Sequence, residues 1–353
     1  MKQNFFMFAK STYFGYTKHM LTQQNFSKPL VAWYKQHKRD LPWRNTKDPY
    51  AIFVSEIMLQ QTRVEAVKKY YAPFIQKFPT TKALSNASQE ELLRAWQGLG
   101  YYRRAKNLQR ACMQIETEYN GQFPTTQKEL SLLYGVGLYT SCAVASICFN
   151  ERVPAVDGNV LRVFARVTAL PDNVLLEKTK QNVYQQLLPL VPKEAGSFNQ
   201  AFMDLGSSIC LPANPLCQHC PLASVCKGKH NPTAFPVREK KQNKPAFHKT
   251  VAILYYKDAI CIEKRKDDGL LAGMYAFPNL DGWLTEAEAT AWVEKNFGNV
   301  QALTQQYHKK HIFTHQIWNM RVYVFTLSSI KTTSFVPDIS AYPIPTAFLK
   351  CLP

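Results

Sequence analysis

The sequence has no run of eighteen consecutive apolar residues, which excludes a membrane-spanning helix. Acidic residues are scarce, because 25 Asp and Glu stand against 43 Lys and Arg, and the formal net charge is +18. Apolar residues still make up 46% of the chain, a proportion that excludes global disorder. The sequence therefore predicts a folded protein with a polyanionic partner, either nucleic acid or an acidic membrane surface.

The nine cysteines do not suit a secreted disulfide framework, because their number is odd and four lie in one short stretch. These four are Cys210, Cys217, Cys220 and Cys226. Zinc sites usually pair two Cys-x-x-Cys knuckles across a longer loop, whereas here only Cys217 and Cys220 form one. Pro221 follows a ligand directly, as in ferredoxin-type runs. We therefore expect one 4Fe-4S cluster on these cysteines, in a reducing compartment.

Length and composition divide the 353 residues into two folded parts, since this length exceeds one ordinary core. Residues 1–24 are basic and aromatic without an acidic residue, and we expect a flexible extension outside the fold. Residues 227–247 are rich in Lys, Arg and Pro and predict a basic linker. Two domains remain, residues 25–226 and residues 248–353.

The two domains differ in the periodicity of their apolar residues. In the first domain helical spacing predominates and period-two runs are scarce, which predicts a mostly α-helical fold with one helix starting after Ser88. In the second domain the apolar runs 250–256 and 320–327 predict strands, and residues 285–297 predict a helix between them. The second domain is therefore expected to be α+β.

Two short segments each place a pair of glycines just before a predicted helix. They are Gly98-Leu-Gly100-Tyr-Tyr and Gly135-Val-Gly137-Leu-Tyr. Glycine permits a tight turn and a close approach of the backbone to another surface, and the free N–H groups of a helix N-terminus suit a phosphate. The alternative is an ordinary helix–helix turn with a glycine cap.

Five segments occur in an order that resembles one protein family. They are SEIMLQQT (55–62), GLGYYR (98–103), LYGVG (133–137), VDGNV (156–160) and the cysteine loop. Over residues 25–353 the chain resembles adenine DNA glycosylases of the MutY family, within the helix-hairpin-helix glycosylase superfamily. The cysteine loop and VDGN are shared with endonuclease III relatives, whereas LQQT and GLGYY favour MutY itself. In one departure, Tyr134 stands where the family hairpin usually has proline.

The resemblance implies two catalytic carboxylates. Glu56 would protonate a ring nitrogen of the departing adenine, although its helical position alone indicates a solvated polar face. Asp157 would stabilise the oxocarbenium-like sugar with help from Asn159, and it also suits a helix N-cap. Tyr139 stands where bifunctional relatives have a Schiff-base lysine, and residues 129–177 contain no lysine. Hydrolysis is therefore expected, without lyase chemistry.

The resemblance also implies how the chain would hold DNA. The target base must leave the duplex, and Gln61 and Tyr101 match the family's wedge and stacking positions, although core packing is the alternative for Tyr101. The hairpin contacts are expected from Gly135, Gly137 and Thr140. Adenine itself is expected to contact Trp43, Arg44 and Gln200.

In the second domain, residues 268–278 resemble the start of a Nudix fold, which the family uses to sense 8-oxoguanine. The predicted helix 285–297 lacks the Arg-Glu-x-x-Glu-Glu array of a Nudix hydrolase, so nucleotide hydrolysis is not expected. Phe313, Thr314 and His315 match the loop that would probe the oxidised guanine, and a polar turn between strands is the alternative.

The sequence thus predicts a helix-hairpin-helix glycosylase domain with an iron–sulfur loop, followed by an α+β Nudix-like domain. The predicted function is monofunctional excision of adenine opposite 8-oxoguanine or guanine in double-stranded DNA, in base excision repair. We expect a monomer that does not bind membranes and is cytoplasmic, associated with the nucleoid in a bacterium. The alternatives are an endonuclease III-like lyase for damaged pyrimidines and a non-enzymatic iron–sulfur DNA-binding protein.

Overall fold

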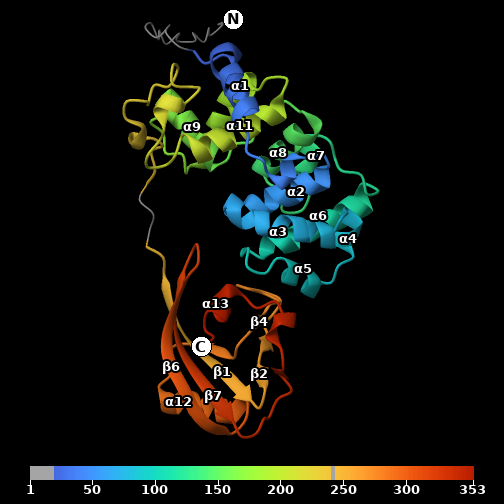
Figure 1. Cartoon of the computed structure of the whole chain (residues 1–353), viewed down its shortest axis with the longest axis vertical. Helices are drawn as coiled ribbons and strands as arrows, with labels where there is room; N and C mark the ends of the chain where they lie inside the picture. Colours follow the sequence, from blue (N-terminus) through green and yellow to red (C-terminus); the bar gives the residue numbers. More distant parts are fainter. Residues whose placement is uncertain (1–19, 240–242) are drawn as a thin grey trace, which may run out of the picture. The chain divides into compact units, whose positions relative to one another are not determined.

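The computed structural model describes residues 20–239 and 243–353 (Figure 1). The expectation of a flexible extension over residues 1–24 falls mostly outside the described residues. Its last part differs from that expectation, because Thr22 caps the π-helix η1 (Gln23–Ser27). The Gln23 amide also donates to the carbonyl oxygens of Pro189 and Val191 at 3.0 and 3.2 Å. The folded chain therefore begins before residue 25.

The described residues form two compact units, each built from two separate segments of the chain. The first unit comprises residues 20–40 and 141–239, and the second comprises residues 41–140 and 243–353. The expected fold class is confirmed: the structure is helical up to residue 239, and a mixed sheet follows it. None of the helices in the described part of the chain is long and apolar enough to cross a membrane.

The first unit packs long helices around an aromatic centre. Its helices are η1, α1 (Lys28–His37), most of α8 (Leu138–Phe149), α9 (Gly158–Thr168), α10 (Glu177–Leu187) and α11 (Ala195–Ser208), with the short 3₁₀-helices η3 (Leu188–Leu190), η4 (Cys217–His219) and η5 (Pro232–Ala234). Helix α11 packs between α1 and α9 (Figure 1). The rings of Phe26, Phe198 and Phe202 meet there at centroid distances of 5.1 to 6.4 Å, and all three are fully buried.

The stretch expected as a linker packs partly against this unit. The amides of Lys227 and Gly228 donate to carbonyl oxygens of Val167 and Arg166 at the end of α9. The amide of Val174 likewise donates to the carbonyl of Val237 at 3.2 Å. Residues 227–237 thus adopt a fixed path, although their composition is typical of a linker.

The helical segment of the second unit consists of short and medium-length helices, several of which start where the sequence predicts. Its helices are η2 (Pro42–Arg44), α2 (Pro49–Leu59), α3 (Val64–Lys77), α4 (Thr81–Ser85), α5 (Gln89–Ala95), α6 (Arg103–Glu118) and α7 (Gln127–Leu130). Helix α5 starts where the sequence predicts it, because Ser88 and Glu91 form a capping box. Helices α6 and α8 follow the two double-glycine segments, also as predicted.

The C-terminal segment of the second unit is a sheet with a helix on each face. Its strands are β1 (Ala246–Tyr256), β2 (Ala259–Cys261), β3 (Glu263–Lys264), β4 (Tyr275–Ala276), β5 (Asn279–Asp281), β6 (Val300–Ile312), β7 (Ile317–Leu327) and β8 (Phe335–Val336). The order is β6-β7-β1-β2-β8, with β5 also on β1 and β3–β4 as a separate pair. Strands β1 and β7 are parallel, and the other pairs are antiparallel. Helix α12 (Glu286–Asn296) packs on one apolar face and α13 (Thr346–Leu349) on the other (Figure 1).

Candidate active site and cysteine loop

Glu56 lies in a helix that is buried all round. Every residue of α2 from Tyr50 to Met58 is buried, and Glu56 itself is 4% exposed. The hydroxyl of Tyr139 donates to Glu56 Oε2 at 2.8 Å. The alternative of a solvated polar face is therefore wrong. Two predicted catalytic residues, separated by 83 positions in the chain, are in direct contact.

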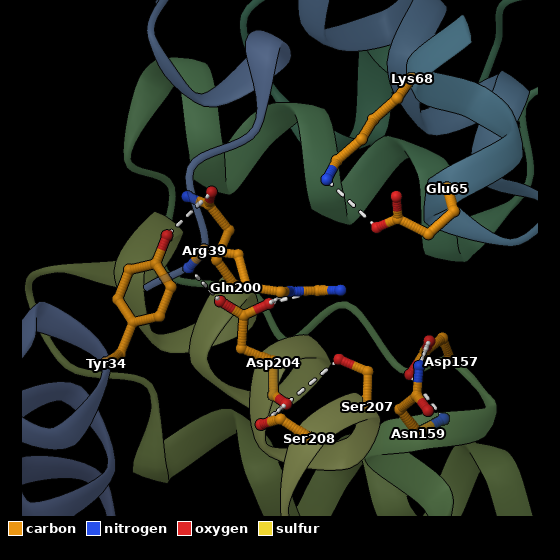
Figure 2. Close-up of polar contacts among 10 residues, drawn as sticks. All are labelled: Tyr34, Arg39, Glu65, Lys68, Asp157, Asn159, Gln200, Asp204, Ser207 and Ser208. Carbon is orange, nitrogen blue, oxygen red and sulfur yellow. Dashed lines mark hydrogen bonds and ion pairs between the residues drawn. The ribbon is translucent and has the colours of Figure 1, made fainter. Parts of the chain in front are cut away.

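The structure bears out the N-cap that the sequence offers as one role of Asp157. It is the N-cap of α9, and its Oδ1 accepts the amides of Asn159 and Val160 at 2.9 and 2.7 Å. The side-chain amide of Asn159 donates to Asp157 Oδ2 at 2.9 Å, as Figure 2 shows. Burial raises the pKa of Asp157, while these hydrogen bonds oppose the shift. The carboxylate is thus held by both oxygens in a place where its charge is poorly solvated.

Arg162, which sequence reasoning missed, connects this carboxylate to the cysteine loop. Its Nη2 donates to Asn159 Oδ1 at 2.9 Å and to the carbonyl of Gly206 at 2.6 Å. Its Nε donates to the carbonyl of Cys210 at 2.9 Å. The position one helical turn after Asn159 could have indicated this contact. Arg162 therefore fixes the Asn159 amide that holds Asp157.

The four predicted ligands lie around one cavity. Cys210, Cys217, Cys220 and Cys226 all line it, together with Arg166, Lys229 and apolar side chains. Burial, with a smaller contribution from the neighbouring thiols, raises the pKa of Cys220 to about 12 and raises that of Cys226. Among the described residues no group of three His, Cys, Asp or Glu side chains is arranged to hold a single metal ion. The structure thus gathers the four thiols at one place.

Arg166 ties α9 to the start of this loop and to the segment that follows the loop. It is 2% exposed, and it donates to Cys210 Sγ at 3.3 Å and to the carbonyl of Leu211 at 2.6 Å. Its Nε donates to the carbonyls of Pro232 and Phe235 at 2.8 and 3.1 Å. Sequence reasoning also missed this residue, since an arginine on an amphipathic helix is usually exposed. It holds residues 210–212 and 232–235 together.

The predicted flipping residues both have left-handed backbones. Gln61 has φ 58° and Tyr101 has φ 50°, and both side chains are exposed. Such a conformation costs a non-glycine residue about 1–2 kcal/mol, and it persists where the surroundings enforce it. The exposure of Tyr101 contradicts the alternative of core packing. Within the second unit, Tyr101 Oη lies 2.6 Å from Thr314 Oγ1, which joins two predicted DNA contacts.

The hairpin approaches α6 closely. Gly135 has φ 72°, and a Cβ there would lie 2.7 Å from the side chain of Asn107. Tyr134, the departure from the family pattern, donates its amide to Gln114 Oε1 at 2.9 Å, and Arg110 lies 3.3 Å from its ring centroid. Gly137 is exposed with open space at its Cβ position. Contacts with α6 therefore hold the hairpin that lacks proline.

The remaining predicted contacts differ in exposure. Thr140 is buried and its hydroxyl accepts the Gln60 amide at 3.1 Å, so its side chain faces the protein. Trp43 is buried against Tyr71, whereas Arg44 is half-buried. Gln200 accepts the Tyr34 hydroxyl at 3.1 Å (Figure 2).

The loop between β6 and β7 anchors one side chain and exposes two. Phe313 packs edge-on against Trp318 at a centroid distance of 4.8 Å and belongs to the apolar layer under α13. Thr314 and His315 are exposed. The Lys244 ammonium donates to the Phe313 carbonyl at 2.8 Å. The loop therefore has a fixed base and two exposed polar side chains, of which Thr314 contacts Tyr101.

Comparisons with protein families match the helical segment and the C-terminal sheet to two different families. Residues 54–193 match the HhH-GPD superfamily of base excision DNA repair proteins, and residues 250–353 match the NUDIX domain. A thermostable thymine-DNA glycosylase has a similar structure, with a TM-score of 0.55 and 28% identity over 59% of this chain and 96% of its own. A non-covalent endonuclease III–DNA complex gives a TM-score of 0.51 and 27% identity over 60% and 98%.

Three relatives from different organisms carry the name adenine DNA glycosylase. An adenine DNA glycosylase of Buchnera aphidicola (subspecies Baizongia pistaciae) is 34% identical over 84% of this chain and 84% of its own. The adenine DNA glycosylase of Arabidopsis thaliana is 36% identical over 77% and 49%. That of Homo sapiens is 44% identical over 58% and 39%. The chain therefore belongs to the family of adenine DNA glycosylases, within the helix-hairpin-helix base excision repair superfamily.

Proposed function

We propose that this DNA N-glycosylase hydrolyses the bond between adenine and deoxyribose when the adenine is paired with 8-oxoguanine or guanine in double-stranded DNA. The observation that supports the reaction best is the burial of Glu56 against the Tyr139 hydroxyl. Adenine is a poor leaving group unless a ring nitrogen is protonated, and a buried carboxylic acid can donate that proton. The chain would act as a monomer.

Asp157 has the second chemical role in the proposal. As the base departs, positive charge develops on the sugar, and a preorganised carboxylate stabilises that charge without having to reorient. Asn159 and the backbone amides of α9 hold both oxygens of Asp157 in place. Tyr139 cannot form a Schiff base, so water completes the reaction and the backbone of the DNA stays intact.

The cysteine loop is proposed to hold one 4Fe-4S cluster on Cys210, Cys217, Cys220 and Cys226. The four thiols line one cavity, and their burial makes a thiolate unfavourable unless a cation is bound nearby. Base excision involves no electron transfer, so the cluster would have a structural role. Bound to the four cysteines, it would order the loop. Arg162 and Arg166 of α9 bind Cys210, so an ordered loop would also hold α9 in position.

Replacing Cys217 with serine tests this assignment. The purified wild-type chain is expected to be brown and to contain about four irons, as the cluster type requires. Cys217→Ser should lose most of its iron, and its Kd for duplex DNA should rise about tenfold or more, because metal ligation is coupled to loop folding. Cys351→Ser, outside the loop, is the control. A colourless, fully active wild type with one zinc per chain would contradict the assignment.

Selection of 8-oxoguanine is proposed to depend on Thr314 and His315. The lesion differs from guanine by one added oxygen and one ring N–H, so a few hydrogen bonds must distinguish them, each worth about 1 kcal/mol. Thr314→Ala, and more strongly His315→Ala, should lower the ratio of single-turnover rates for A:8-oxoguanine over A:G. Excision from A:G should remain. An unchanged ratio in both variants would assign lesion recognition elsewhere, and Thr332→Ala is a matched control.

A further inference from the structure

We infer that Arg104 is the positioning residue for base flipping, because its one guanidinium holds the two loops that present Gln61 and Tyr101. The inference rests on the proposed function, in which these side chains enter the duplex. Arg104 lies in the first turn of α6 and is half-buried. Its contacts reach residues more than 40 positions earlier in the chain.

The first loop begins where α2 ends. The Nη1 of Arg104 donates to the carbonyl oxygens of Ile57 and Met58 at 2.8 and 2.9 Å and also to that of Gln60. The first two oxygens belong to the last turn of α2, where carbonyls lack amide partners within the helix, and Gln60 is its C-cap. Gln61 follows immediately with φ 58°. The guanidinium therefore fixes the peptide from which the strained residue starts.

The second loop is held by the other end of the same group. The Nη2 of Arg104 donates to the carbonyls of Leu99 and Gly100 at 3.4 and 3.2 Å and to Thr62 Oγ1 at 3.1 Å. Tyr101 follows with φ 50°, and its ring centroid lies 5.3 Å from the guanidinium carbon. Oxygens bound to this one side chain thus lie on both sides of Gln61 and directly before Tyr101.

Only an arginine fits this arrangement. The six acceptors of Arg104 are neutral oxygens, four at or just after the end of α2 and two in the loop before α6, and a planar fork of N–H donors can reach both segments at once. A lysine ammonium is a single point with three donors, so it can hold one loop but not both. Burial lowers the pKa of Arg104 to about 10, and the group stays charged at neutral pH.

The test compares Arg104→Lys and Arg104→Met with Arg103→Met, an exposed neighbour in the same helical turn. Single-turnover excision is measured on two duplexes with the same A:8-oxoguanine pair. In one duplex the neighbouring pairs are intact, and in the other they are mismatched, so that less unstacking is required. A 2-aminopurine beside the target reports flipping by fluorescence without excision.

Both Arg104 variants should lose excision about 100-fold on the intact duplex, the size expected for a small misplacement of positioning groups. The loss should shrink to about tenfold or less on the mismatched duplex, because flipping is easier there. The fluorescence change should fall in parallel, and Arg103→Met should resemble the wild type. Equal losses on both duplexes, or normal fluorescence, would overturn the inference.

Should an Arg104 variant fail to fold, as circular dichroism would show, Thr62→Val takes its place. It removes one acceptor of the guanidinium and should give a smaller loss with the same dependence on the duplex. Failure of the proposed function looks different, since the wild type would then excise adenine from neither duplex. If the wild type excises adenine and Thr62→Val loses the same factor on both duplexes, the positioning role of Arg104 is excluded and the proposed function stands.

Discussion

Glu56→Gln should bind DNA containing an A:8-oxoguanine pair and fail to excise the adenine. An amide cannot donate the proton that the base requires, and general acid catalysis of this kind contributes about 10²- to 10⁴-fold. The side chain keeps its size and can still accept the Tyr139 hydroxyl, which donates to Glu56 Oε2 at 2.8 Å. The loss should therefore appear in the single-turnover rate and leave the Kd for DNA nearly unchanged.

The matched control is Glu65→Gln, which neutralises an exposed glutamate at the start of α3. Tyr139→Phe separates the hydroxyl from the acid and should cost less than Glu56→Gln, because the carboxyl group itself remains. Near-normal excision by Glu56→Gln would show that Glu56 is not the proton donor.

Asp157→Asn should abolish most excision and yet raise the melting temperature at neutral pH. The substitution removes the negative charge that stabilises the developing sugar cation, and electrostatic groups of this kind contribute about 10²- to 10³-fold. Stability changes in the opposite direction because burial raises the pKa of Asp157 in the folded state. An ionised Asp157 is therefore less favourable in the folded protein than in the unfolded chain.

The direction of this pKa shift also predicts how the melting temperature of Asp157→Asn depends on pH. A carboxyl group whose folded pKa exceeds its unfolded pKa stabilises the fold most at low pH, and that contribution disappears as the pH rises through the folded pKa. The gain in melting temperature for Asp157→Asn should thus shrink as the pH falls towards about 4, the ordinary range of aspartate. Asp172→Asn, an exposed residue of the same unit, should show no such trend. A lower melting temperature for Asp157→Asn at pH 7 would contradict this account.

Local patterns were sufficient to predict the elements that have their own start signals or apolar faces. The capping boxes at Ser88 and Thr285 mark α5 and α12 in the sequence, and apolar runs mark β1 and β7. Strand β6 was missed because it is an edge strand with largely exposed, polar side chains, so it lacks an alternating apolar face. Its existence depends on pairing with β7.

The candidate site was predictable to the extent that motifs name residues. The motifs predicted Glu56, Asp157 and the four cysteines, and the structure adds the contact between Glu56 and Tyr139. Arg104 and Arg166 could not be found in this way, since their partners are mostly backbone carbonyls of distant segments. For Arg162 the sequence indicates at most the contact with Asn159, because its other acceptors are also distant carbonyls. Every residue has a backbone carbonyl, so the residue type does not show which carbonyl accepts a hydrogen bond. Only the folded structure identifies the arginine that binds it.

The first unit is discontinuous, and this affects how the chain folds as it leaves the ribosome. Phe26 packs against Phe198 and Phe202 of α11, and Tyr34 contacts Gln200 across 166 positions of sequence. At roughly 5–20 residues per second, translation separates these partners by about 8–33 s. During that time residues 41–140 can assemble locally while the apolar side of α1 stays uncovered. The growing chain should therefore bind holdase chaperones through α1, and their release should coincide with the emergence of α11.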